Sequence, residues 1–84
     1  KIMNFYVYVL KSLGSKNVTY VGYAKDVKKR VLLHNKGKGA KFTRGRKWKL
    51  IYKEKHRSKN KAISREYYIK KNRSLRNKIK SLYQ

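Results

Sequence analysis

Apolar and polar residues alternate in three short segments of the chain. Residues 5–11 run Phe-Tyr-Val-Tyr-Val-Leu-Lys, residues 18–23 run Val-Thr-Tyr-Val-Gly-Tyr, and residues 48–54 run Trp-Lys-Leu-Ile-Tyr-Lys-Glu. A period of two, carried by β-branched and aromatic residues, is typical of strands. Ser, Gly and Asn residues separate the first two segments, which predicts a turn and hence an antiparallel hairpin.

Three further segments carry apolar residues with the period of a helix. Each begins at a residue whose side chain can cap a helix N-terminus: the candidates are Asp26, Ser58 and Ser74. The first helix is expected to extend to about residue 36, and the second to be about fourteen residues long. The side chains expected to form apolar stripes are Val27, Val31 and Leu32 in the first helix and Leu75, Ile79 and Leu82 in the third.

The resulting order, β-β-α-β-α-α, predicts a mixed α/β (α+β) fold. The 84 residues have room for one domain, residues 1–84, with a modest core. The absence of Cys excludes a disulfide scaffold and a thiolate zinc site, and it indicates a reducing compartment. No apolar run is long enough for a signal peptide or a membrane span, so we expect a cytoplasmic, cytosolic or nucleoid-associated protein.

Charge changes this picture most. Lys and Arg number 26 against only Asp26, Glu54 and Glu66, so the net charge is +23. A compact chain with this charge repels itself, and a phosphate backbone relieves that repulsion, so a nucleic acid is the expected partner. A tight homodimer is not expected unless nucleic acid lies between the subunits. Eight Tyr, two Phe and one Trp exclude a disordered basic tail.

One carboxylate, Glu66, falls on the apolar side of the second helix. On a helical wheel it lies near the middle of an apolar stripe. That stripe consists of Ala62, Ile63, Tyr67 and Ile69. A carboxylate that faces a core needs a cation or a full set of donors. Two interpretations remain open, a salt bridge to Lys70 one turn further on or a metal ligand in a phosphate site, and the helix pattern alone favours the salt bridge.

The first helix carries Arg30 and His34 one turn apart, at the edge of its apolar stripe. A guanidinium suits a phosphate oxygen, and an imidazole can donate a hydrogen bond or transfer a proton, so the two can act on one ligand. The alternative is a solvated charged face.

Tyrosines mark both strands of the hairpin, Tyr6 and Tyr8 in the first and Tyr20 and Tyr23 in the second. Tyr8 and Tyr20 share a face only if paired residues have numbers with an even sum, such as Tyr8 opposite Tyr20 or Gly22. Such aromatic residues form a core or a platform on which unpaired bases stack. Gly22 leaves room for a backbone or a ligand to approach the sheet.

The two tyrosine-containing tripeptides resemble the signature of the GIY-YIG nuclease superfamily. They are Tyr6-Val7-Tyr8 and Tyr20-Val21-Gly22, with Tyr6 in place of the first Gly of the motif. The same family has an Arg with a His or Tyr one turn later on the next helix, and a metal-binding Glu on a later one. The matching residues here are Arg30, His34 and Glu66. Residues 34–45 and 65–71 further resemble the small single-domain bacterial branch related to the excision-repair nuclease module.

This resemblance implies metal-dependent hydrolysis of phosphodiester bonds on a fold with a central three-stranded antiparallel sheet. Glu66 would hold Mg²⁺ or Mn²⁺, and Arg30 would bind the scissile phosphate. Tyr8 would lie near the attacking water, and Tyr20 and His34 would position water or phosphate, with the general base left open. By analogy the substrate is DNA rather than RNA, and the process is of the repair or recombination type.

A basic stretch with several glycines, residues 37–47, is the expected accessory contact to phosphates. The candidate nucleic-acid-binding residues are Lys36, Lys38, Lys41, Arg44, Arg46, Lys47 and Lys70. No recognition domain is visible, so we expect little sequence specificity and a preference for shape or branching. A non-catalytic nucleic-acid-binding domain and a ribosome-associated structural protein remain alternatives, and metal-dependent cleavage discriminates between them and a nuclease.

Overall fold

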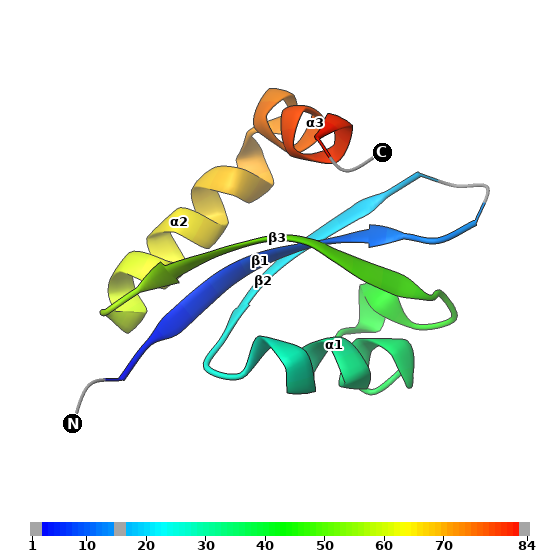
Figure 1. The fold of residues 1–84 in the computed structure, drawn as a ribbon, viewed down its shortest axis with the longest axis horizontal. Helices are drawn as coiled ribbons and strands as arrows, with labels where there is room; N and C mark the ends of the chain where they lie inside the picture. Colours follow the sequence, from blue (N-terminus) through cyan, green and yellow to red (C-terminus); the bar gives the residue numbers. More distant parts are fainter. Residues whose placement is uncertain (1–2, 15–16, 83–84) are drawn as a thin grey trace.

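The structure is a computed structural model that describes residues 3–14 and 17–82. Its elements follow the predicted order (Figure 1). The strands are β1 (Phe5–Ser12), β2 (Thr19–Ala24) and β3 (Trp48–His56). The helices are α1 (Val27–Asn35), α2 (Lys59–Lys71) and α3 (Arg73–Ser81), and a short 3₁₀ helix, η1 (Lys41–Thr43), precedes β3. The α+β class and the three-stranded antiparallel sheet are confirmed. Within the described ranges, no helix is long and apolar enough to cross a membrane.

The strand β1 lies at the centre of the sheet, and β2 and β3 form its two edges. Both edge strands run antiparallel to β1, and Tyr8 stands opposite Gly22. The numbers of this pair have an even sum, so Tyr8 and Tyr20 share a face of the sheet as the alternation requires. The even-sum condition for a shared face is therefore met, with Tyr8 opposite Gly22 and not opposite Tyr20.

The sheet separates two cores, one under α2 and α3 and the other under α1 (Figure 1). Alternate residues of β1 supply them, because successive side chains of a strand point to opposite faces. The first core contains Val7, Val9, Val21, Ile51, Ala62, Ile69 and Ile79, and the second contains Tyr8, Leu10, Val27 and Trp48. Since β2 is an edge strand, side chains from both faces can meet along its free side.

Two of the three predicted helix caps are confirmed. The carboxylate of Asp26 and the hydroxyl of Ser58 each accept the backbone N–H three residues further on. The third prediction is wrong: α3 begins at Arg73, and Asn72 caps it in place of Ser74. Because α2 ends immediately before Asn72, this residue alone connects the two helices, and its amide oxygen accepts the backbone N–H of Leu75 at 3.0 Å.

Four apolar side chains predicted to face the core are instead exposed, namely Leu32, Ile63, Tyr67 and Leu82. In α1 the buried face carries Val27 and His34, which are seven residues apart, and Leu32 lies to one side of it. In α2 only Ala62 and Ile69 are buried, so the row that contacts the sheet is narrower than predicted. Glu66 is consequently at the edge of that row rather than at its middle.

Candidate active site

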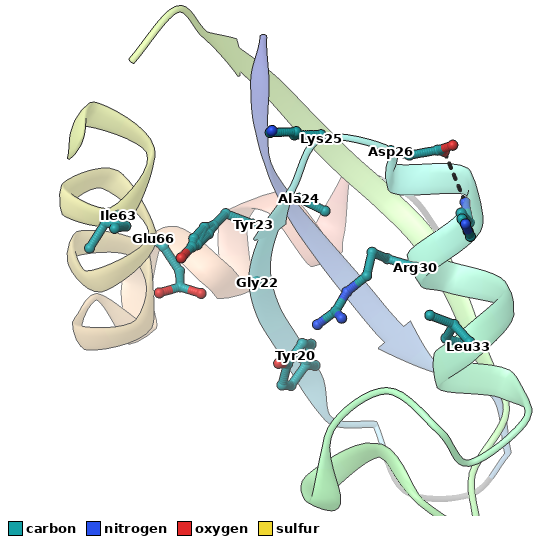
Figure 2. A pocket seen from close by; sticks show the side chains of 11 residues that line it. Tyr20, Gly22, Tyr23, Ala24, Lys25, Asp26, Arg30, Leu33, Ile63 and Glu66 are labelled. Carbon is teal, nitrogen blue, oxygen red and sulfur yellow. Dashed lines mark hydrogen bonds between the residues drawn. The ribbon is translucent and has the colours of Figure 1, made fainter. Parts of the chain in front are cut away.

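A hollow of about 720 Å³ lies along the free edge of β2, between α1 and α2 (Figure 2). Tyr20 and Gly22 come from β2, Arg30 from α1 and Glu66 from α2. Figure 2 shows the side chains of Arg30 and Glu66 on opposite sides of this space, with β2 between them. Three residues predicted as catalytic, Tyr20, Arg30 and Glu66, therefore line one cavity.

Glu66 is only loosely engaged by the protein. Its side chain is 21% exposed, and Lys70 Nζ lies 3.8 Å from its Oε2. The predicted salt bridge is present, but an exposed pair with this spacing contributes only about 0.3–0.5 kcal/mol. The carboxylate is therefore available to a ligand in the hollow, so the salt bridge and the metal-ligand interpretation are compatible.

The other two carboxylates are committed elsewhere. Asp26 caps α1, and Glu54 accepts three hydrogen bonds on the far edge of the sheet. Among the described residues, no three His, Cys, Asp or Glu side chains gather into a metal-binding group. One carboxylate in an open hollow suits Mg²⁺, which keeps several of its waters, and does not suit a zinc site built from three or four protein ligands.

Arg30 has a donor with no acceptor. Its Nε is buried and makes no hydrogen bond to any described residue. A buried unsatisfied donor costs about 1–3 kcal/mol, and the guanidinium is directed into the hollow (Figure 2). An anion in the hollow can accept hydrogen bonds from this guanidinium, whose planar shape matches the geometry of a phosphate.

His34 lies behind the hollow, fully buried, and both of its ring nitrogens are hydrogen-bonded. Nε2 is 2.8 Å from the hydroxyl of Tyr8, and Nδ1 is 2.9 Å from Oγ1 of Thr43. The Thr43 hydroxyl donates to the carbonyl of Ala40 at 2.8 Å, so its oxygen accepts the proton on Nδ1. In neutral imidazole Nε2 is then the acceptor, and Tyr8 donates to it.

The pKa values of these groups fit this arrangement. Burial lowers the pKa of His34, and the nearby Arg30 lowers it further, so the imidazole is neutral. Burial raises the pKa of Tyr8, although the Arg30 guanidinium opposes part of that rise. Burial likewise raises the pKa of Tyr20. The cations of this chain thus do not produce a free phenolate, contrary to what the high charge alone suggests.

Two glycines permit these close contacts. A Cβ built on Gly22 would lie 2.6 Å from the Tyr8 hydroxyl oxygen, and one on Gly39 would lie 2.3 Å from Nδ1 of His34. Both distances are shorter than any real contact of this kind. The space beside Gly22 is therefore filled by Tyr8 rather than left for a ligand, and Tyr8 reaches the strand that lines the hollow.

Arg30 and His34 do not face one ligand directly. Arg30 lines the hollow, whereas His34 contacts Tyr8, so His34 can act only through that tyrosine. Thr43 was not among the predicted site residues. It is buried in η1, and nothing in the local sequence distinguishes its hydroxyl from those of exposed residues.

The basic stretch of residues 37–47 is joined to the site by hydrogen bonds. Thr43 contacts His34, and its carbonyl accepts the indole N–H of Trp48 at 3.0 Å. Asn35 also accepts the backbone N–H of Trp48. Most of the predicted nucleic-acid-binding cations lie exposed, and Arg46 is half-buried. The exposed ones are Lys36, Lys38, Lys41, Arg44, Lys47 and Lys70.

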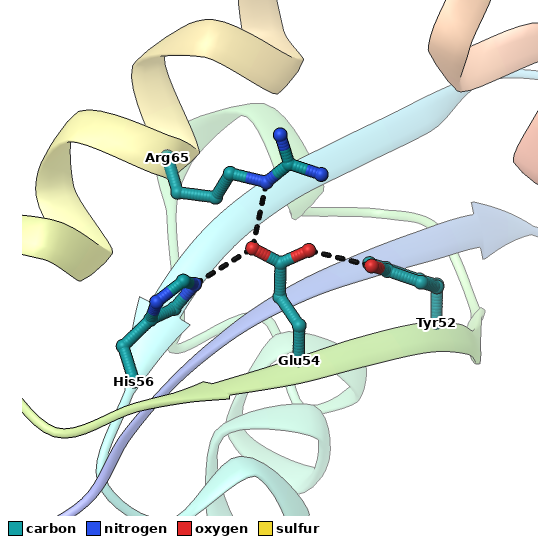
Figure 3. A network of polar contacts seen from close by, with 4 residues as sticks. All are labelled: Tyr52, Glu54, His56 and Arg65. Carbon is teal, nitrogen blue, oxygen red and sulfur yellow. Dashed lines mark hydrogen bonds and ion pairs between the residues drawn. The ribbon is translucent and has the colours of Figure 1, made fainter.

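Glu54 forms a separate polar network that the sequence patterns did not indicate (Figure 3). Its carboxylate is 2.5 Å from the hydroxyl of Tyr52, 2.7 Å from Nε2 of His56 and 2.8 Å from Nε of Arg65. Burial alone would raise the pKa of Glu54, but these hydrogen bonds outweigh it and hold the pKa below its usual value. The network joins β3 to α2, so its role is structural.

Comparison with known proteins decides the family. A family model described as the GIY-YIG catalytic domain matches residues 4–80. The chain belongs to the GIY-YIG family. A UPF0213 protein of Staphylococcus saprophyticus is 44% identical over 66 residues, 77% of this chain and 78% of the relative. One of Clostridium perfringens is 49% identical over 67 residues, 79% of this chain and 70% of the relative.

A solved GIY-YIG relative agrees with the fold. The NMR structure of a UPF0213 protein of Bacillus halodurans is 38% identical, with a TM-score of 0.54, and the match covers 96% of this chain and 86% of that one. The two GIY-YIG tripeptides lie on the paired strands β1 and β2 and meet at one position, where Tyr8 stands opposite Gly22. Their pairing brings Tyr8 against Gly22, which explains physically why this motif position carries a glycine. The family is one of nucleases, so the hollow is a candidate nuclease site.

Proposed function

We propose that this chain is a metal-dependent endonuclease that hydrolyses phosphodiester bonds, with DNA as its substrate and with little sequence specificity. The observation that carries the proposal is the pairing, across one hollow, of an available carboxylate and a guanidinium with an unsatisfied buried Nε. A structural salt bridge would join these two groups, but each instead faces the space between them. A metal ion and the phosphate it binds would satisfy both.

Arg30 and Glu66 divide the binding of the phosphodiester. Glu66 would hold Mg²⁺ or Mn²⁺, which would supply polarisation of the phosphate and stabilisation of the charge on the leaving oxygen. Arg30 binds the scissile phosphate and stabilises the additional negative charge of the transition state. Lys25 and Lys29 also line the hollow and raise the local concentration of a polyanion.

Tyr8 and His34 act together as the proton acceptor. The attacking water must lose a proton. Tyr8 is fully buried against Gly22 and does not itself line the hollow, so the water has to reach its hydroxyl past Gly22; the hydroxyl can then accept that proton while it passes its own proton to Nε2 of His34. This route needs no free phenolate, which matters because burial keeps the Tyr8 hydroxyl protonated. Tyr20 lines the hollow itself and positions the water or the phosphate.

The test is a cleavage assay on labelled branched, nicked and single-stranded DNA in Mg²⁺, Mn²⁺ or EDTA. The unsubstituted chain is compared with Glu66→Gln at protein concentrations that give the same bound fraction. Glu54→Gln is the matched control, because it removes a carboxylate outside the hollow. The nuclease proposal is supported if cleavage requires the metal, is lost in Glu66→Gln and is retained in Glu54→Gln.

The competing function is a non-catalytic nucleic-acid-binding domain on the same fold. It accounts for the net charge of +23. It does not explain why Glu66 lies at the edge of a hollow with only a weak ion pair to Lys70. If the unsubstituted chain binds every substrate with a steep salt dependence and cuts none of them in either metal, the nuclease proposal is wrong and this alternative holds.

A further inference from the structure

A second hollow, of about 560 Å³, continues along the same free edge of β2 toward α3. It meets the first at Tyr20, which lines both. Figure 1 shows α3 on the same side of the sheet as α2, and its residues line the hollow together with the start of β2. The two hollows therefore form one path along the strand edge, with Arg30 and Glu66 in the first part only.

The walls of this second hollow, which we name the α3 groove, differ in chemistry. One wall is cationic, and no carboxylate is among its lining residues. Its cations are Lys70, Arg73, Arg76 and Lys80. Arg76 already donates to the carbonyls of Ile69 and Lys70, and Lys80 lies 3.3 Å from the carbonyl of Asn17. Arg73 is exposed, and no described group occupies its guanidinium.

The opposite wall is aromatic. Phe42, from η1, is 54% exposed although it is one of the largest apolar side chains of the protein. It stacks on Tyr20, with ring centroids 6.3 Å apart and an interplanar angle of 20°, and the guanidinium of Arg46 lies 5.5 Å from its ring centroid. One Nη atom of Arg46 is buried and makes no hydrogen bond to a described group. Phe42 and Tyr20 also pack against Trp48 of the second core, and the exposed part of Phe42 lines the groove.

A cationic wall facing an exposed aromatic ring is the pairing that single-stranded nucleic acids need, because phosphates contact the cations and unpaired bases stack on rings or guanidinium planes. A duplex fits it poorly, since its bases stack on one another and present no free face. We propose that the α3 groove binds an unpaired nucleic-acid strand that leaves the active-site hollow past Tyr20. The natural substrate therefore carries a single-stranded arm, as an overhang, flap or splayed junction does.

This inference rests on the proposed nuclease function, because the strand is said to leave the active-site hollow. Its test measures only nucleic-acid binding and does not require cleavage. The background is Glu66→Gln, so that no substrate is cut. The groove variant adds Arg73→Gln and Lys80→Gln, and the control adds Lys55→Gln and Lys59→Gln, which remove the same charge at β3 and the start of α2. Fluorescence anisotropy measures Kd for a labelled 20-mer of dT, a matched RNA 20-mer of U and a blunt duplex.

The groove variant is expected to bind the single strands about tenfold more weakly and to lower the salt slope by about 1.4, since each phosphate contact contributes about 0.7 for single strands. The control is expected to change single-strand and duplex affinity alike and by less. Phe42→Leu keeps an apolar contact yet should weaken single-strand binding about tenfold, and Phe42→Tyr should restore it. The ratio between the two 20-mers shows whether the arm is DNA or RNA.

Equal losses in the groove and control variants, or a Phe42→Leu variant that binds single strands as the parent does, would overturn the groove proposal. Neither result depends on cleavage. A chain that cuts duplex substrates while its groove variants bind single strands normally is a nuclease without this groove. A chain that cuts nothing but loses single-strand binding in the groove variants has the groove without the enzyme.

Discussion

The hydroxyl of Tyr8 occupies the place where a side chain on Gly22 would begin. A Cβ there would lie 2.6 Å from the hydroxyl oxygen and 2.8 Å from the ring carbon that carries it. Tyr8 is fully buried and hydrogen-bonded to His34, so it cannot turn away. The two motif residues are thus fitted to one another across the β1–β2 pair.

Gly22→Ala should therefore destabilise the protein by about 1–3 kcal/mol, because an added methyl group in a close-packed interior forces neighbouring atoms to move. Urea denaturation measures the change in the free energy of unfolding. Ser64→Ala, on the exposed side of α2, is the control and should shift it by less than about 0.5 kcal/mol. A Gly22→Ala protein as stable as the control would show that Tyr8 can move aside.

Thr43→Val should test the tautomer of His34. The substitution keeps the shape of the side chain but removes the oxygen that accepts the Nδ1 proton, which leaves a buried donor unsatisfied at a cost of about 1–3 kcal/mol. Thr43→Ser should recover most of the loss. Nitrogen NMR of the imidazole should show the proton on Nδ1 in the unsubstituted chain and in Thr43→Ser, and a proton on Nε2 in either would contradict the assignment.

Stability should fall in acid in two separate steps. The pKa of His34 is lowered by burial from its ordinary 6.5, so the folded state binds fewer protons, and its stabilisation is present above about pH 6.5 and lost below it. The pKa of Glu54 is also lowered, from 4.5, because its hydrogen bonds outweigh the effect of burial, so its contribution is lost below about pH 4.5. In both steps the free energy of unfolding decreases as the pH is lowered.

Urea midpoints measured from pH 8 down to pH 3 should separate the two steps. His34→Gln should remove the dependence just below pH 6.5 and keep the lower step, whereas Glu54→Gln should do the reverse. A His34→Gln protein that keeps the upper step would assign that step to another group.

Arg30→Lys should show that the guanidinium is needed as a planar donor and not only as a charge. A Lys in its place keeps the charge but loses the fork, so cleavage should fall by about 10²-fold while DNA affinity changes little. Single-turnover cleavage with saturating protein measures this directly. Lys28→Arg, at an exposed position of α1 outside the hollow, should cut at the unsubstituted rate; an equal rate for Arg30→Lys would remove Arg30 from the chemistry.

Much of the fold follows from local patterns. The alternation of residues 5–11 and the Asp26 and Ser58 caps act within a few residues, so the strands and two helix starts were predictable. Local patterns did not predict which residues of α1 are buried, as Leu32 and His34 show. Hydrophobicity favoured Leu32 for the core, but His34 is buried because Tyr8 in β1 and Thr43 in η1 satisfy both nitrogens of its ring.

The candidate site likewise has a part that the sequence predicted and a part that only the tertiary fold determines. Arg30 and Glu66 stand on their helices at positions that the motif resemblance identified, and the fold brings them to one hollow. The hydrogen bond of Thr43 to His34 and that of Arg65 to Glu54 join different elements, whose proximity depends on the tertiary fold, so no spacing in the sequence could indicate them.

The free edge of β2 has a consequence for how copies of this chain meet. An unpaired strand edge invites another strand to add to the sheet, and here the added strand would cover Tyr20 and Gly22 and close the hollow. Two copies that each carry +23 repel one another strongly. The positive charge that attracts a polyanion therefore also protects the strand edge from self-association, and only an anionic chain can approach it without opposition.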